Sequence, residues 1–218
     1  MDIYSDARRD MVAQQLKKRG IKDPLILKAM LTVPRHEFVP HESQRSAYYD
    51  GPLLIGCSQT ISQPYMVAVM TEALLLKGGE KVMEVGTGSG YQAAVLAEIC
   101  NKVYSVERHA ALAERADKTL KEQGYHNIHV LVGDGTLGLP HKAPFDGIIV
   151  TAGAPYVPES LKEQLAEGGR LVIPVGGRMM QSLVRITRRG ETFDEENLLG
   201  CVFVPLIGKK GWQSGENY

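Results

Sequence analysis

The sequence predicts an α/β fold: a mostly parallel sheet covered by helices, with a helical extension before the sheet and antiparallel strands after it. Three observations predict this fold. From residue 79 onward, short apolar runs of strand character alternate with helical segments, which is typical of parallel strands joined by right-handed crossovers. A glycine-rich turn joins the first strand to the first helix of this series. The last two strand-like runs have no helix between them, which predicts antiparallel pairing.

The composition is that of an ordinary globular protein. The chain has 218 residues, and its 25 Lys and Arg balance its 25 Asp and Glu, so nothing global favours nucleic acid or an anionic membrane. No apolar run approaches the ~18 residues that span a membrane, and the charged N-terminus has no signal-like segment. The three cysteines form no CxxC pair, and no metal-ligand spacing occurs. We therefore expect a cytoplasmic protein without a metal.

The length suits one domain rather than two. We expect a single domain over residues 1–218. Residues 1–78 would form a helical extension with the active-site loop, and residues 79–218 would form the cofactor-binding α/β body.

Two helices are expected at the N-terminus. Ser5 or Asp6 can cap the first, and Gly20 suits the left-handed residue that ends it. Asp23 can cap the second, which should end before Pro34 because the residue preceding a proline avoids the α region.

A long, weakly regular stretch follows at 35–62, and such stretches inside compact chains are often functional. A third helix is expected from about residue 64 to residue 76. Ser62, just ahead of Pro64, is a candidate N-cap for this helix.

The body alternates strands and helices as far as residue 174, and two further strands surround a polar turn at 189–191. Its expected strands are 81–85, 103–107, 128–132, 145–151, 170–174, 182–188 and 199–204, and its expected helices are 91–99, 110–123 and 158–165.

The first strand leads through Glu84 into a turn with three alternate glycines: Gly86, Thr87, Gly88, Ser89 and Gly90. Glycine lets the backbone pass close to a ligand, and the following helix offers its N–H groups. A dinucleotide site would place Gly or Ala where this chain has Tyr91. The pattern instead resembles the S-adenosylmethionine site of the class I methyltransferases, whose Rossmann-like sheet this body would share. The plainer alternative is a tight turn that binds nothing.

Two acidic residues end the next two strands. Glu107, with Arg108 beside it, could accept hydrogen bonds from both ribose hydroxyls. Asp134, followed by Gly135, lies where this fold class faces the adenine, although Asp-Gly is also a common turn. Ligands of open α/β sheets bind at the carboxyl ends of the strands, so these positions point to one nucleoside-type site.

A more specific resemblance rests on the run Gln59-Thr60-Ile61-Ser62-Gln63-Pro64 and covers nearly the whole chain. The run is similar to the signature of the protein-L-isoaspartate (D-aspartate) O-methyltransferase family. The match continues at 33–35, 38–39, 84–92, 133–135, 143–146, 168–176 and 203–206.

This resemblance implies a repair enzyme. It would methylate the free α-carboxylate of L-isoaspartyl residues in damaged proteins and peptides, and the ester would cyclise to a succinimide that partly hydrolyses to aspartate. Ser62 would be the catalytic residue, donating a hydrogen bond to the substrate carboxylate. Thr60 and Ile61 would contact cofactor and substrate, and Val204 would border the substrate backbone. Because a carboxylate is already ionised at neutral pH, positioning rather than a general base should dominate.

The chain departs from the family pattern before Gln59, where Leu54 replaces a proline and Ser58 a glycine. Ser58 would strain the loop if that glycine needs a positive φ. One alternative is another methyltransferase, for small molecules or nucleic acid, although residues 151–156 lack the Asn/Asp-Pro-Pro-Tyr/Phe motif of base-amino enzymes. A noncatalytic cofactor-binding protein is the other. We expect a monomer whose partners include no nucleic acid and no membrane.

Overall fold

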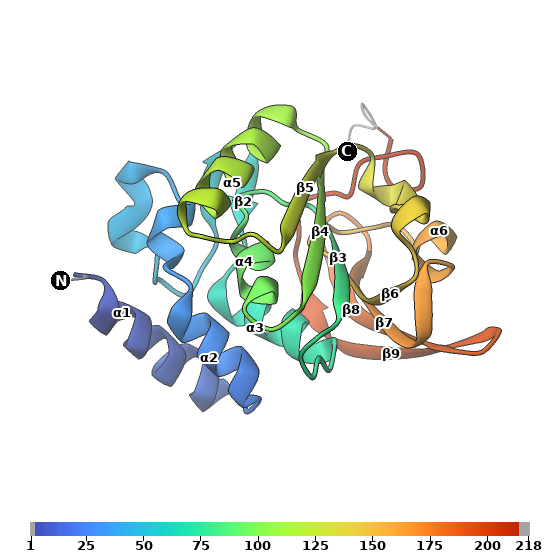
Figure 1. Cartoon of the computed structure of the whole chain (residues 1–218), viewed down its shortest axis with the longest axis horizontal. Helices are drawn as coiled ribbons and strands as arrows, with labels where there is room; N and C mark the ends of the chain where they lie inside the picture. The colour runs from blue at the N-terminus through green and yellow to red at the C-terminus, as the bar shows by residue number, and fades with distance from the viewer. Residues whose placement is uncertain (1–2, 214–218) are drawn as a thin grey trace.

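A seven-stranded sheet forms the centre of the computed structural model, which describes residues 3–213 (Figure 1). The strand order is β5-β4-β3-β6-β7-β8-β9. The first five of these run parallel, and β8 and β9 are antiparallel to their neighbours. The predicted parallel sheet with an antiparallel C-terminal edge is therefore confirmed. The strands are β3 (Lys81–Val85), β4 (Lys102–Glu107), β5 (Ile128–Val132), β6 (Phe145–Val150), β7 (Leu165–Gly176), β8 (Gln181–Arg189) and β9 (Thr192–Cys201).

The last strand is placed differently from the prediction. It was expected at 199–204, but β9 begins at Thr192, and Val204 lies beyond its end. Gly190 has a φ of +61°, which allows a tight turn that pairs Arg189 directly with Thr192. Most of β9 is exposed, so its residues are polar and lack the apolar alternation by which a half-buried strand is recognised.

Helices cover the sheet and extend beyond it at the N-terminus (Figure 1). The helices of the body are α3 (Pro64–Ala73), α4 (Tyr91–Ala97), α5 (Ala110–Glu122) and α6 (Glu159–Lys162), with 3₁₀ turns at Gly135–Leu137 and Pro140–Lys142. The extension contains α1 (Ser5–Asp10), a π-helical continuation (Met11–Leu16), a 3₁₀ turn (Lys17–Arg19), α2 (Pro24–Thr32) and two more 3₁₀ turns (Arg35–Phe38 and His41–Ser46).

Three of the predicted helix ends are confirmed, and the expected cap of α1 is not. Asp23 accepts a hydrogen bond from the Leu25 N–H at 2.8 Å, Gly20 is left-handed, and α2 ends before Pro34. The N-cap of α1 is Tyr4, without a side-chain cap, rather than Ser5 or Asp6.

Two apolar cores lie on opposite faces of the sheet. Successive residues of a strand point to opposite faces, so Val82 joins the core beneath the N-terminal helices and α3, whereas Met83 joins the core that includes Leu161 of α6. Strands buried on both faces are mostly apolar, as in the Ile148–Val150 run of β6, and Glu84 is the buried exception in β3. The first core also contains Met11, so the N-terminal extension packs on the body.

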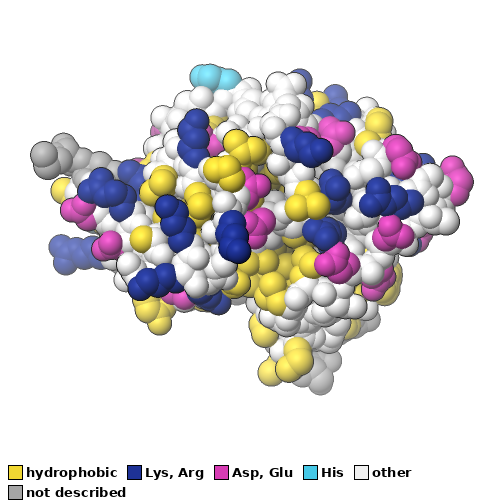
Figure 2. Space-filling view, turned by 90° about the horizontal axis from the view of Figure 1, so that it is seen from below, with side chains coloured by type: hydrophobic (Ala, Val, Ile, Leu, Met, Phe, Trp, Pro, Cys, Tyr) yellow, Lys and Arg dark blue, Asp and Glu magenta, His cyan; other side chains and the backbone are white. Residues whose placement is uncertain are grey.

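The surface in Figure 2 shows hydrophobic side chains gathered in a hollow near the middle of that face. Cationic and anionic side chains are interspersed around it. Within residues 3–213, no helix is both long and apolar enough to cross a bilayer.

A hairpin of β1 (Leu53–Gly56) and β2 (Gln59–Ile61) leads into the segment that contains Ser62. Its two turn residues, Cys57 and Ser58, have φ values of 51° and 55°. Gly56 pairs with Gln59 across them. A two-residue turn with two positive φ values favours glycine at its second position, so Ser58 does hold the strained conformation that its departure from the family pattern implied.

Replacing Ser58 by glycine should stabilise the protein by about 0.5–1 kcal/mol, because glycine adopts a positive φ without a Cβ clash. In a protein of this size the melting temperature should rise by about 1–4 °C in thermal denaturation. Ser43→Gly, within a 3₁₀ turn, is the matched control and should lower it. A lower melting temperature for Ser58→Gly would contradict this account of the turn.

Candidate active site

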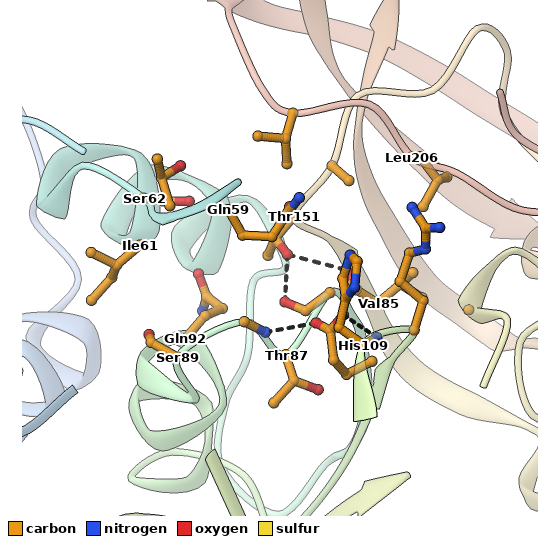
Figure 3. Close-up of a pocket in the computed structure, with 18 of the residues that line it drawn as sticks. Gln59, Ile61, Ser62, Val85, Thr87, Ser89, Gln92, His109, Thr151 and Leu206 are labelled. Atoms are coloured by element: carbon orange, nitrogen blue, oxygen red, sulfur yellow. Dashed lines mark hydrogen bonds between the residues drawn. The ribbon is translucent and has the colours of Figure 1, made fainter. Parts of the chain in front are cut away.

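A cavity opens at the carboxyl ends of the parallel strands, where the glycine turn, the end of β4, the segment after β2 and the C-terminal loop meet (Figure 3). Eleven of the residues expected at the site line it: Thr60, Ile61, Ser62, Gly86, Thr87, Gly88, Ser89, Glu107, Arg108, Gly135 and Val204. The other three expected residues, Glu84, Gly90 and Asp134, are not among its lining residues.

The glycine turn is shaped by close backbone packing. Gly86 has a φ of +99°, and a Cβ there would lie 2.4 Å from the Thr151 hydroxyl oxygen. That hydroxyl donates to the Gly86 carbonyl at 2.7 Å, which joins the turn to the end of β6. Gly88, with a φ of +53°, directs its N–H toward Glu107. The first two glycines therefore hold the turn open along the cavity.

The other two glycines serve packing between elements. Gly90 is the left-handed N-cap of α4, and a Cβ there would lie 3.3 Å from Ala116 and from Leu120 of α5. Gly135 lines the cavity, but a Cβ at this position would lie 2.4 Å from a methyl carbon of Val85. At both positions, packing against a neighbouring element requires glycine whether or not a ligand binds.

Glu107 is the best-oriented acid of the cavity. Its side chain is 5% exposed, yet the carboxylate lies on the lining. One oxygen accepts the Gly88 N–H at 2.9 Å, and the other accepts the His109 N–H at 2.9 Å. Each carboxylate oxygen keeps a second lone pair, so Glu107 can still accept two hydrogen bonds from a diol.

Glu84 is fully buried behind the turn. It accepts a hydrogen bond from Ser105 at 2.5 Å, and Ser105 is 2.5 Å from the Thr87 hydroxyl. The other carboxylate oxygen of Glu84, Oε1, has no hydrogen-bond partner among the described residues. Burial, together with the charge of Glu107, raises the pKa of Glu84 to about 8, although the bond from Ser105 opposes this. Glu84 therefore supports the turn through Ser105 and Thr87, rather than lining the cavity as expected.

Replacing Glu84 by glutamine should stabilise the protein at pH 8 by several degrees. The folded-state pKa of about 8 lies above the ordinary carboxyl value of 4.5, so the native state holds an extra proton between these two pH values and loses stability as pH rises through them. Glutamine resembles the neutral carboxyl and removes this loss. The melting temperature of Glu84→Gln should rise relative to that of the parent protein from pH 6 to pH 8. Replacing the exposed Glu114 by glutamine is the charge control. A melting-temperature difference between the two proteins that does not change with pH would rule out the titration of Glu84 over this range.

Asp134 turns toward the C-terminal loop. One oxygen accepts from the Thr136 N–H and hydroxyl at 3.0 and 2.6 Å, and the other accepts from the Lys209 N–H at 2.8 Å. Partial burial raises the pKa of Asp134, but these hydrogen bonds outweigh it, so the pKa lies below its ordinary value. The carboxylate thus caps a 3₁₀ turn and anchors the loop, and its expected contact with adenine stays a prediction.

Ser62 lies between β2 and α3, at one side of the cavity (Figure 3). The expected cap is wrong: Gln63 is the N-cap of α3, and no side-chain cap bond is formed there. Gln63 instead donates to the Asp50 carboxylate at 2.8 Å. Because Pro64 lacks an N–H, the first turn of α3 has one donor fewer to satisfy.

A buried arginine holds the Ser62 backbone. Arg35 is 0% exposed and donates to the Ala47 and Ser62 carbonyls at 2.6 and 2.8 Å. Its guanidinium lies 4.8 Å from the ring centre of Tyr91, at the start of α4. Burial lowers the pKa of Arg35 to about 10, so the cation persists at neutral pH. One side chain from the extension thus ties the Ser62 segment to the helix after the glycine turn.

A second groove adjoins the cavity and shares Thr60, Ser62, Thr151, Val204 and Pro205 with it. The charged side chains among its described lining residues are those of Arg19 and Arg178. Ser62 therefore stands between a cavity that contains a buried acid and a groove whose charged lining is cationic. This arrangement can hold a nucleoside-type molecule on one side and an anionic group on the other.

Sequence reasoning missed several lining residues. Gln92 and Tyr91 lie within a matched stretch but beyond the glycines, and His109 follows the expected residues Glu107 and Arg108. The C-terminal loop adds Leu206, which lies in the matched stretch 203–206, and Ile207, to which no role was assigned. Gln92 carried a usable signal, because a polar residue among the apolar residues of a buried helix needs a reason. Ile207 carried none, since folding alone brings it to the cavity. Among residues 3–213, no cluster of His, Cys, Asp or Glu could hold a metal ion.

Comparisons with known proteins agree with this geometry. The family model "Protein-L-isoaspartate(D-aspartate) O-methyltransferase (PCMT)" matches residues 7–211. A protein-L-isoaspartate O-methyltransferase of Syntrophotalea carbinolica is 58% identical over 210 residues, covering 96% of this chain and 97% of that protein. Another, of Geobacter metallireducens, is 56% identical over 214 residues, covering 98% of this chain and 99% of that one.

Solved structures agree as well. A protein-L-isoaspartate O-methyltransferase matches with a TM-score of 0.83 at 31% identity, covering 94% of this chain and 67% of that chain. A putative one from Plasmodium falciparum, in complex with S-adenosyl-L-homocysteine, matches with a TM-score of 0.81 at 28% identity, covering 92% and 98%. The fold is that of the class I S-adenosylmethionine-dependent methyltransferases. The chain belongs to the protein-L-isoaspartate (D-aspartate) O-methyltransferase family.

Proposed function

We propose that this chain transfers a methyl group from S-adenosylmethionine to the free carboxylate of L-isoaspartyl residues in damaged proteins and peptides, which starts their repair. The observation that carries the proposal is the position of Ser62 between the cavity and the adjoining groove. The cofactor would occupy the cavity, and the peptide would occupy the groove.

The residues of the cavity fit the cofactor. Glu107 presents two oriented carboxylate oxygens to a ribose diol, and the backbone of the glycine turn leaves room along the cavity wall. Thr60, Ile61, Arg108 and Gly135 complete the surface around it. When bound, S-adenosylmethionine supplies a methyl group activated by a sulfonium cation.

The groove fits an anionic peptide segment. The Ser62 hydroxyl donates a hydrogen bond to the substrate carboxylate, and Arg35 holds the Ser62 backbone in place. Val204 borders the peptide from the opposite wall. The charged side chains of the groove lining are those of Arg19, which is paired with Asp50 at 3.1 Å, and Arg178. Since the carboxylate is already ionised near neutral pH, the protein has to orient it and exclude water rather than remove a proton.

Three wider properties belong to the same proposal. The chain acts as one domain, because its N-terminal core residues pack against residues of the sheet. It works as a monomer, since both the cavity and the groove are formed within one chain. It acts in the cytoplasm, where a chain with three unpaired cysteines stays reduced.

Methyl transfer to two matched peptides tests the proposal. One peptide contains L-isoaspartate and the other contains aspartate at the same position. Labelled S-adenosylmethionine should methylate only the first, as a base-labile ester. Cofactor binding without transfer to the isoaspartyl peptide would reject the substrate and retain the cofactor. Transfer to small carboxylic acids instead would favour a small-molecule methyltransferase.

A further inference from the structure

A glutamine at the start of α4 faces the cavity with a buried oxygen that no described residue satisfies. Gln92 is 7% exposed and lines the cavity. Its Nε2 lies 2.9 Å from the Thr71 hydroxyl oxygen of α3. Its Oε1 has no hydrogen-bond partner among residues 3–213. A buried amide oxygen without a partner is costly, so it requires an explanation.

The orientation of this amide is determined by its neighbour. The Thr71 hydroxyl donates its only proton to the Val67 carbonyl at 2.7 Å. The hydroxyl can therefore only accept from Gln92, and the group that faces it must be the amide nitrogen. Exchanging the two amide atoms would bring two acceptors together. Gln92 thus presents an acceptor, and not a donor, on its other side.

Gln92 lies at the Ser62 side of the cavity. In Figure 3, Ser62, Ser89 and Gln92 lie on one side, and His109 and Leu206 lie on the other. Glu107, held by the Gly88 and His109 N–H groups, belongs to the side of β4. A ligand that fills the cavity and reaches Ser62 with its reactive group must pass close to Gln92.

The chemistry of the cofactor leaves one donor for this acceptor. S-adenosylmethionine carries hydrogen-bond donors on its adenine amine, its two ribose hydroxyls and its α-ammonium group. The ribose hydroxyls suit Glu107, and the adenine lies beyond the ribose, away from the sulfonium. The sulfonium must lie near Ser62 for methyl transfer to the groove. The α-ammonium, on the far side of the sulfonium from the ribose, is the donor that remains.

We propose that Gln92 is a cofactor-binding residue whose Oε1 accepts a hydrogen bond from the α-ammonium of S-adenosylmethionine, with Thr71 positioning the amide. The inference rests on the proposed function, because it takes S-adenosylmethionine as the ligand of the cavity. An amide oxygen suits this role, since it binds a cation without adding a second buried carboxylate charge beside Glu107.

Two ligands, one with and one without the amino-acid chain that carries the ammonium group, test the inference by calorimetry. S-adenosyl-L-homocysteine carries the ammonium, whereas 5′-methylthioadenosine keeps the nucleoside and the sulfur but lacks the amino-acid chain. Gln92→Leu should weaken the binding of S-adenosyl-L-homocysteine about 10- to 100-fold, the range for a hydrogen bond to a charged group. It should change the affinity for 5′-methylthioadenosine by less than about twofold.

Gln15→Leu is the matched control. The Gln15 amide also donates through Nε2, to the Tyr48 carbonyl at 2.8 Å, and it also has an unpartnered buried Oε1, but it is not a lining residue of the cavity. This variant should bind both ligands as the parent protein does. Gln92→Met provides a second apolar variant, and thermal melting checks that each variant is folded.

Equal losses for both ligands would overturn the inference, because they would mean that Gln92 only supports the shape of the cavity. Unchanged binding of S-adenosyl-L-homocysteine by Gln92→Leu and Gln92→Met would also overturn it. Failure of the parent protein to bind S-adenosyl-L-homocysteine would instead reject the proposed cofactor. The two failures are therefore distinguishable.

Discussion

Replacing Glu107 by alanine is expected to weaken the binding of S-adenosyl-L-homocysteine by about 100-fold or more, because two charge-assisted hydrogen bonds to the ribose would be lost together. The carboxylate is oriented in advance by the Gly88 and His109 N–H groups, so little freedom remains to be lost on binding. Titration calorimetry measures the dissociation constant. Glu107→Gln should also bind weakly, since its amide nitrogen would face one of those two N–H donors.

The control for Glu107 is the exposed residue Glu114, whose replacement by glutamine removes a negative charge at a distance from the cavity. Glu114→Gln should bind as the parent protein does. Melting curves without ligand separate lost affinity from lost stability. Near-parental affinity in a folded Glu107→Ala variant would show that the ribose is held elsewhere in the cavity.

Replacing Ser62 by alanine is expected to lower turnover on an isoaspartyl peptide by about 10- to 100-fold, because a hydrogen bond to a charged group contributes about 1.5–3 kcal/mol. Affinity for S-adenosyl-L-homocysteine should change by less than about twofold, since the hydroxyl is assigned to the substrate. Stability should change by less than about 0.5 kcal/mol, because Ser62 caps no helix. Steady-state kinetics, calorimetry and thermal melting measure these three quantities on the same sample.

Ser62→Thr tests the same role with the hydroxyl retained, and it should keep more activity than Ser62→Ala. Asp23→Ala is a useful contrast, because Asp23 does cap α2 through the Leu25 N–H. That variant should lose about 1 kcal/mol of stability and keep its turnover at permissive temperature. Unchanged turnover in Ser62→Ala would remove the residue from the mechanism.

Much of the fold was predictable because its signals are local. The strand at 81–85 and the strand at 128–132 were predicted with the bounds that the structure has, since short apolar runs between turn residues indicate strands. Gly20 ends one helical segment and Asp23 begins the next, as expected, because these preferences depend on local backbone conformation. The polar strand β9 was displaced, since an exposed edge strand carries little hydrophobic pattern.

The candidate site divides in the same way. The glycine turn and Glu107 were predicted because strand ends and turns in this fold class define one edge of the sheet. The partners of individual polar side chains were not predictable. Asp134 and Lys209 are 75 positions apart, and Arg35 reaches the Ser62 carbonyl from 27 positions away. A single sequence contains no signal for either contact.

By itself, then, the sequence determined the order of the elements, the parallel sheet, the glycine turn and the family resemblance, all of which follow from short-range patterns of residues. Only the tertiary structure decided that Ser62 caps no helix, that Glu84 is buried behind the turn and that Gln92 presents an unsatisfied oxygen to the cavity. The physical reason is that backbone preferences act between neighbouring residues. The hydrogen bonds, burial and charge that define a site depend on which distant segments folding brings into contact.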